Sequence, residues 1–181
     1  MSRPGVFLDR DGVLNAALVT AGRPGSPRER EELELLPGVQ DACAQLADAG
    51  LVLIVVTNQP DIARGLVDPV VVDDLNRQLL GSLALHDVIV CPHDDGDACA
   101  CRKPKPGMLL EGASRWDIDL SQSVMVGDRW RDIEAGRAAG TRTVFVDRGY
   151  DEPAPDNPNL TVKELHESVP WIIRTAGQHR S

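Results

Sequence analysis

The feature that most constrains this chain is a short run of Val, Ile and Leu that recurs along it. A run this short without polar alternation is typical of a strand covered on both faces. Stretches with helical spacing of apolar residues separate the runs. The alternation predicts an α/β fold, a doubly wound (Rossmann-like) parallel sheet with helices on both faces. The expected strands are 5–8, 51–56, 88–90, 124–126 and 143–146, and the expected helices are 39–49, 69–84, 106–116, 131–139 and 162–175.

Length and charge limit the organisation and the partners. A chain of 181 residues with 42% apolar content is expected to form one domain over residues 1–181. Its 28 acidic residues exceed its 19 basic ones, for a net charge of -9, which disfavours nucleic acid and anionic membranes as partners. No run approaches the roughly 20 apolar residues of a membrane span, and no leader precedes the first strand. We therefore expect a cytoplasmic protein, a monomer, with a small-molecule ligand.

Polar residues follow four of the predicted strands. In a doubly wound sheet the ligand lies off the carboxyl ends of the strands, so these residues should meet in one crevice. They are Asp9-Arg10-Asp11-Gly12, Thr57-Asn58-Gln59, Arg102-Lys103-Pro104 and Gly127-Asp128.

The pair Asp9 and Asp11 suits phosphoryl transfer. One carboxylate can attack phosphorus while the other protonates the leaving oxygen and later deprotonates water, so Asp9 is predicted as nucleophile and Asp11 as general acid/base. Taken alone, Asp-Arg-Asp-Gly is equally consistent with a hydrogen-bonded surface turn. Thr57 and Lys103 are predicted to stabilise the phosphoryl group, and Asp128 to complete a Mg²⁺ site with Asp9 and Asp11.

A second metal site is predicted where cysteines crowd together. Cys91, His93, Cys99 and Cys101 place three thiolates and one imidazole in a single short segment. This donor set matches tetrahedral zinc with no open position, so the Zn²⁺ is expected to be structural. It would hold a loop rich in Asp and Gly so that Arg102 and Lys103 project toward the phosphate. The fourth cysteine, Cys43, falls in a helical pattern and is interpreted as a buried thiol.

These motifs carry a resemblance to a known family. The order Asp9-x-Asp11, Thr57, Lys103, Gly127-Asp128 resembles the four motifs of the haloacid dehalogenase superfamily of phosphatases. The segments LDRDGVLN, VVTNQ followed by ARG, CRKPKPGM and MVGDRWRDIEAGRAAG look more closely like its D-glycero-D-manno-heptose 1,7-bisphosphate 7-phosphatases and related histidinol-phosphate phosphatases. Both groups are small, lack a large cap domain and carry a zinc loop.

The resemblance implies a Mg²⁺-dependent hydrolase that forms an aspartyl-phosphate and acts on a small phosphorylated sugar in carbohydrate metabolism. It implies the heptose bisphosphate as substrate, with histidinol phosphate or another sugar phosphate as alternatives. A catalytically inactive, zinc-stabilised binding module is the alternative from another class. The predicted substrate-binding residues are Arg10, Asn58, Gln59, Arg102 and Arg129, the last in place of a lysine common in the family.

The chain departs from the family pattern near the first motif. The heptose phosphatases commonly show a His-Gly-Tyr segment there, whereas residues 16–27 read AALVTAGRPGSP, and Pro60-Asp61 replaces the usual Ser-Gly. Arg23, Arg28 and Arg30 near this rewritten loop offer guanidinium groups for a second phosphate, and a solvated loop is the competing interpretation. Asp128 is interpreted as a helix cap and Asp132 as a carboxylate favoured by the first helical turn.

Overall fold

The main sheet confirms the predicted α/β architecture. The computed structural model describes residues 2–177, and its six-stranded sheet has the order β5-β4-β1-β6-β7-β8 with every pair parallel. The chain builds outward from the central β1 to β4 and β5, then returns to add β6, β7 and β8 on the other side. This reversal beside β1 is where doubly wound folds bind ligands. The strands are β1 (Gly5–Leu8), β4 (Val52–Asn58), β5 (Asp87–Cys91), β6 (Val124–Gly127), β7 (Arg142–Val146) and β8 (Leu160–Val162).

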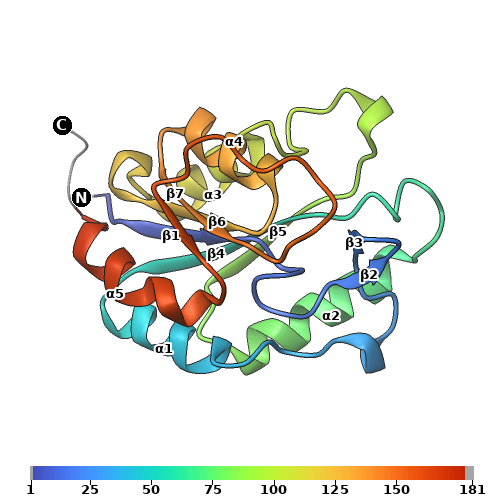
Figure 1. Cartoon of the computed structure of the whole chain (residues 1–181), viewed down its shortest axis with the longest axis horizontal. Coiled ribbons are helices and arrows are strands. Elements are labelled where there is room, and N and C mark those ends of the chain that lie inside the picture. The colour runs from blue at the N-terminus through green and yellow to red at the C-terminus, as the bar shows by residue number, and fades with distance from the viewer. Residues whose placement is uncertain (1, 178–181) are drawn as a thin grey trace.

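Helices cover both faces of this sheet (Figure 1). On one face lie α1 (Val39–Asp48), α2 (Pro69–Ser82) and α5 (Leu165–Thr175), and on the other lie α3 (Gly107–Trp116) and α4 (Trp130–Ala139). The change of face follows the reversal of strand order, because each parallel crossover is right-handed. All five predicted helices occur close to their expected bounds.

The core is divided by the central strand. Val6 and Leu8 of β1 pack in the cluster that contains the buried residues of α1 and α5, whereas Phe7 packs with Met108 and Leu109 of α3. All of these side chains are fully buried. Because strand side chains alternate between faces, a strand buried on both sides must be apolar throughout, as the sequence run predicted.

Three short strands were missed from the sequence. β2 (Leu18–Thr20) and β3 (Arg23–Gly25) form an antiparallel hairpin within the rewritten loop, and β8 adds a sixth strand to the sheet. Each of these strands has three residues, which is too short to show a periodic pattern. Ala21 and Gly22 close the hairpin with φ values of 50° and 75°.

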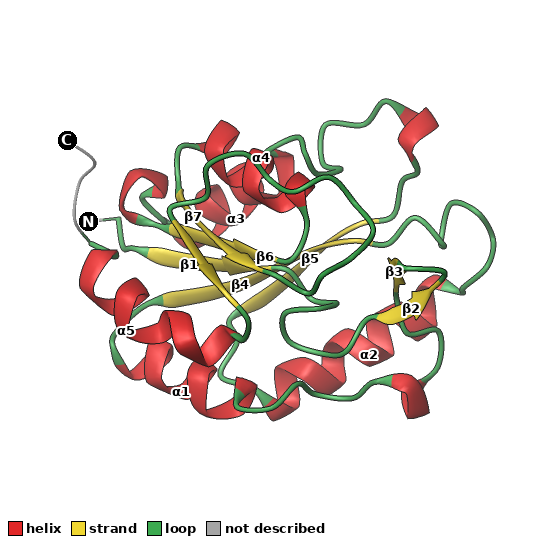
Figure 2. Cartoon of the chain, viewed as in Figure 1, coloured by secondary structure: helices red, strands yellow, loops and turns green. Residues whose placement is uncertain are grey.

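Nothing resembling a large cap domain is inserted within residues 2–177. Between β1 and α1 the chain forms only the β2–β3 hairpin and the 3-10 helix η1 (Arg30–Glu32). Figure 2 shows this hairpin beyond the carboxyl end of the sheet, on the side where the long loops gather. Of the helices in the described part of the chain, none is both long and apolar enough to cross a bilayer.

Candidate active site

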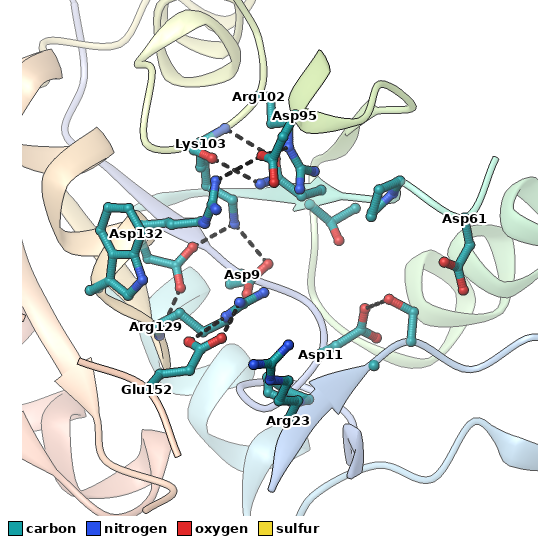
Figure 3. A pocket seen from close by; sticks show the side chains of 18 of the residues that line it. Asp9, Asp11, Arg23, Asp61, Asp95, Arg102, Lys103, Arg129, Asp132 and Glu152 are labelled. Atoms are coloured by element: carbon teal, nitrogen blue, oxygen red, sulfur yellow. Dashed lines mark hydrogen bonds and ion pairs between the residues drawn. The ribbon is translucent and has the colours of Figure 1, made fainter. Parts of the chain in front are cut away.

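A pocket of about 500 Å³ opens at the carboxyl edge of the sheet (Figure 3). Its lining comes from segments far apart in the sequence: the end of β1, the hairpin, the end of β4, the segment after β5, the start of α4 and the loop after β7. The predicted residues Asp9, Asp11, Thr57 and Lys103 all line it. The sheet therefore brings three of the four motifs to one crevice, and the fourth lies directly behind it.

Lys103 organises the floor of the pocket. Its Nζ lies 2.8 Å from Asp9 Oδ1 and 2.6 Å from Asp132 Oδ1, and it donates to the carbonyl of Val56 at 2.8 Å. Asn58 fixes the Lys103 backbone, because its side chain accepts from the Lys103 amide and donates to the Lys103 carbonyl, both at 3.1 Å. The ammonium is thus held in one place beside the predicted nucleophile.

Burial shapes the electrostatics of this floor. Desolvation and the neighbouring Asp132 carboxylate raise the pKa of Asp9 to about 6, although Lys103 offsets part of that rise. Desolvation works against the charge of Lys103, but Asp132 and Asp9 prevail and raise its pKa. Lys103 therefore stays protonated and can offer positive charge to a phosphoryl oxygen.

Asp11 is held in a different way. Its carboxylate accepts from Arg10, Asn15 and Ser26 and from the Gln59 side-chain amide, at distances from 2.7 to 3.2 Å. Burial opposes ionisation, but Arg10 and the other donors lower the pKa of Asp11 overall. Asp11 is thus a fixed carboxylate at the pocket wall.

Two predicted substrate-binding residues lie outside the pocket lining. Arg10 is fully buried and outside the pocket lining, and it bonds Asp11 and the Oδ1 of Asn76 at 3.0 Å. Gln59 is also buried and bonds both Asp11 and Thr57. In this structure both side chains hold Asp11 in place, and their contact with substrate stays a prediction. Proximity in sequence to a catalytic residue does not reveal which way a side chain points.

The structure adds Asp132 as a candidate ligand to the predicted Mg²⁺ site, and the assignment of Asp11 to that site stays a prediction. Carboxylate oxygens of Asp9, Asp128 and Asp132 lie within 4.8 Å of one another, whereas the side chain of Asp11 is outside this group. Asp132 follows Asp128 at the start of α4, and its role was missed because a carboxylate in a first helical turn is common. The expected cap is also corrected: Asp132, not Asp128, closes the helix start, by accepting from the Arg129 amide at 3.0 Å.

The surroundings of Asp128 fit a cation. Both of its carboxylate oxygens are buried and receive no hydrogen bond of ordinary geometry within residues 2–177. Desolvation and the charge of Asp9 raise its pKa well above the usual range, and the nearby Tyr150 hydroxyl offsets only part of this. A side chain at Gly12 would place a Cβ 1.8 Å from Asp128 Oδ2. The missing side chain leaves room beside a buried charge that a hard cation such as Mg²⁺ would compensate.

The four zinc candidates also come together. Cys91 Sγ lies 3.0 Å from Cys101 Sγ, 3.8 Å from Cys99 Sγ and 3.6 Å from His93 Nδ1. Zinc bonds of about 2.0–2.3 Å imply ligand separations of roughly 3.3–3.8 Å. The distances from Cys91 to Cys99 and His93 fall in this range, whereas the distance to Cys101 is shorter, so a bound Zn²⁺ would move these two sulfur atoms apart. Desolvation opposes the thiolate of Cys99, but the amide of Arg102 and the neighbouring thiols lower its pKa to about 7.

The remaining predicted substrate-binding residues lie at the pocket surface. Asn58, Arg102 and Arg129 line the cavity. Arg102 bonds Asp95 at 2.8 Å, and Arg129 forms a two-pronged ion pair with Glu152. Their contact with substrate stays a prediction.

Comparison with known proteins agrees with this geometry. Residues 100–168 match the HAD-hydrolase-like family model. A D-glycero-beta-D-manno-heptose-1,7-bisphosphate 7-phosphatase from Rhodopseudomonas palustris is 39% identical over 76% of this chain and 80% of its own length. The enzyme of that name from Escherichia coli K12 is 36% identical over 96% of this chain and 90% of its own length.

Solved structures give the same result. The crystal structure of the D,D-heptose 1,7-bisphosphate phosphatase from B. bronchiseptica, complexed with magnesium and phosphate, superposes with a TM-score of 0.79 at 30% identity. The match covers 94% of this chain and 98% of that one. With its parallel sheet, its two-aspartate motif and these relatives, the chain belongs to the haloacid dehalogenase-like hydrolases, in the branch of the heptose bisphosphate phosphatases.

Proposed function

We propose that this protein removes the 7-phosphate of D-glycero-D-manno-heptose 1,7-bisphosphate in a Mg²⁺-dependent reaction. The observation that carries the proposal is the Lys103 ammonium held 2.8 Å from Asp9 at the floor of the pocket, beside the buried Asp128 carboxylate. This is the arrangement that a nucleophilic carboxylate needs to approach an anionic phosphoryl group. The names of the relatives supply the substrate.

The first half of the reaction transfers the phosphoryl group to the protein. A carboxylate oxygen of Asp9 attacks phosphorus, and the bond from phosphorus to the sugar oxygen breaks. Asp11 gives a proton to that departing oxygen. The negative charge of a bound phosphoryl group opposes the lowering of the Asp11 pKa by Arg10, and this favours the protonated form that the step requires.

The second half returns the protein to its starting state. Asp11, now a carboxylate, takes a proton from water, and the oxygen of that water attacks the phosphorus of the aspartyl-phosphate. The bond from phosphorus to Asp9 breaks, and inorganic phosphate leaves. Lys103 balances the charge of the phosphoryl group in both halves. Thr57 lines the pocket, and the side-chain amide of Gln59 donates hydrogen bonds to both Thr57 and Asp11.

The carboxylates of Asp9, Asp128 and Asp132 are the residues that would hold Mg²⁺. When bound, the ion would supply positive charge beside the phosphoryl oxygens and orient them for in-line attack. The cysteine cluster would hold structural Zn²⁺ and keep Arg102 and Lys103 in position. The net negative charge and the small pocket support a free sugar phosphate as substrate. A cytoplasmic monomer is proposed from the sequence alone.

The test is phosphate release in Mg²⁺ from a substrate panel. It holds both anomers of the heptose 1,7-bisphosphate, fructose 1,6-bisphosphate, histidinol phosphate and an aryl phosphate. We expect the highest kcat/KM on the heptose, with the β anomer preferred because the relatives are named for it. A kcat/KM more than about tenfold higher on histidinol phosphate would overturn the heptose assignment, and no turnover of any compound would overturn the phosphatase assignment.

A further inference from the structure

The pocket is lined by six cationic side chains, and five of them are already engaged by acids. Lys103 is held by Asp9 and Asp132 at the floor. Four arginines around the rim each pair with a carboxylate, and two of them share one. These pairs are Arg64 with Asp94, Arg102 and Arg131 with Asp95, and Arg129 with Glu152. The ion pairs of ordinary length measure 2.7 to 3.1 Å.

Arg23 is the exception. It lines the same pocket, yet its guanidinium forms no hydrogen bond or ion pair with any of residues 2–177. Figure 3 shows its side chain rising from the hairpin toward the middle of the pocket, between Asp11 and the Arg129–Glu152 pair. A guanidinium exposed at a pocket wall without a partner can bind an anion and give up no existing contact.

The backbone of Arg23 is held on two sides. It pairs with Thr20 across the hairpin, and the carbonyl of the adjacent Gly22 accepts from the Asp151 amide at 3.0 Å. A Cβ at Gly22 would approach the Cβ of Asp151 to 3.1 Å, so the hairpin tip packs closely on the loop after β7. The side chain is therefore free, but the point from which it reaches into the pocket is fixed.

The other two arginines near the loop do not share this position. Arg28 pairs with Asp61 at 2.8 Å, and neither Arg28 nor Arg30 is among the pocket-lining residues. Arg30 lies on the 3-10 helix η1, where its side chain is exposed. Of the three arginines that the sequence suggested for a second phosphate, only Arg23 lines the pocket.

We propose that Arg23 determines specificity by binding the second, non-reacting phosphate of a bisphosphorylated sugar while Asp9 attacks the first. This inference rests on the proposed function, because it presupposes a substrate with two phosphates. The engaged rim arginines would have to surrender a carboxylate to bind the same group, which offsets part of the gain. Arg23 gives up only water.

The test compares Arg23→Gln, Arg23→Lys and the wild type on two substrates, the heptose 1,7-bisphosphate and the heptose 7-phosphate that lacks the second phosphate. Arg30→Gln is the matched control, since Arg30 is an arginine of the same connection that lies outside the pocket. The measured quantity is the ratio of kcat/KM for the bisphosphate to that for the monophosphate. Melting temperatures of all four proteins establish that each is folded.

We expect Arg23→Gln to lower this ratio about tenfold or more, mainly through KM, because a charge-assisted contact to one phosphate is lost. Arg23→Lys should fall between the wild type and Arg23→Gln, and Arg30→Gln should keep the wild-type ratio. A ratio unchanged within about twofold in Arg23→Gln would overturn the inference while leaving the proposed function intact. A wild type that hydrolyses aryl phosphate but neither heptose phosphate would overturn both.

Discussion

The two candidate metal sites of this protein are built in opposite ways. The carboxylates of Asp9, Asp128 and Asp132 come from two segments far apart in the sequence and are all buried. The thiolates and imidazole occupy residues 91–101, a single segment that begins at the last residue of β5, and of these four residues only Cys91 is buried. The first site exists only when the sheet is formed, whereas the second requires one loop to close.

Because of this difference, the geometry of the first site depends on the sheet, whereas that of the second depends more on a bound metal. Asp9 and Asp128 follow strands β1 and β6, which pair directly, so the sheet sets their separation whether or not a metal is present. The loop after β5 is not paired into the sheet in this way, and a metal would add cross-links to the ion pairs that Asp94 and Asp95 make with arginines. The two sites meet at Lys103, which follows Cys101 by two residues and reaches Asp9. A substitution that disturbs the loop should therefore lower the catalytic rate by displacing Lys103.

The largest effect should come from the carboxylate site. Replacing Asp9 with Asn should lower kcat by about 10³-fold or more, because the substitution removes the attacking oxygen while nearly preserving shape. The melting temperature should stay close to that of the wild type. An exposed carboxylate on α1 serves as control, and Asp41→Asn should keep full activity. More than a few per cent residual turnover in Asp9→Asn would refute the nucleophile assignment.

A second change separates metal binding from chemistry. Asp128→Asn should lower Mg²⁺-dependent activity about a hundredfold, since a neutral amide is a poor ligand for a hard cation. The metal-free protein should melt at the same or a higher temperature, because the buried charge has no ordinary hydrogen bond. Mg²⁺ should raise the melting temperature of the wild type but not that of the variant. A full Mg²⁺-induced shift in the variant would remove Asp128 from the site.

The thiolate site should respond in the reverse order, with stability falling first. Cys99→Ser should lower the zinc content, reduce the melting temperature by about 5 °C and reduce kcat/KM by about tenfold as Lys103 loses its support. Cys43→Ala is the control, because Cys43 is a core cysteine outside the cluster, and this variant should lose stability while keeping zinc. Zinc measured by atomic absorption in both variants decides the matter, and an unchanged content in Cys99→Ser would contradict the assignment.

The sequence alone was enough to predict the features that depend on a few consecutive residues. The apolar runs predicted five strands of the sheet and its doubly wound form, because a strand covered on both faces must be apolar throughout. The cysteine spacing predicted the donor set that the structure brings together. The motif order placed Asp9, Thr57 and Lys103 at one edge, because the ends of parallel strands meet there.

Only the tertiary structure decided how side chains far apart in sequence face one another. It turned Arg10 and Gln59 away from the cavity, brought Asp132 against Lys103 and aimed Arg23 at the pocket. These outcomes depend on the rotation of α4 against the sheet and on the docking of the hairpin against the loop after β7. Both arise from packing between distant segments, and a local pattern carries no record of such packing.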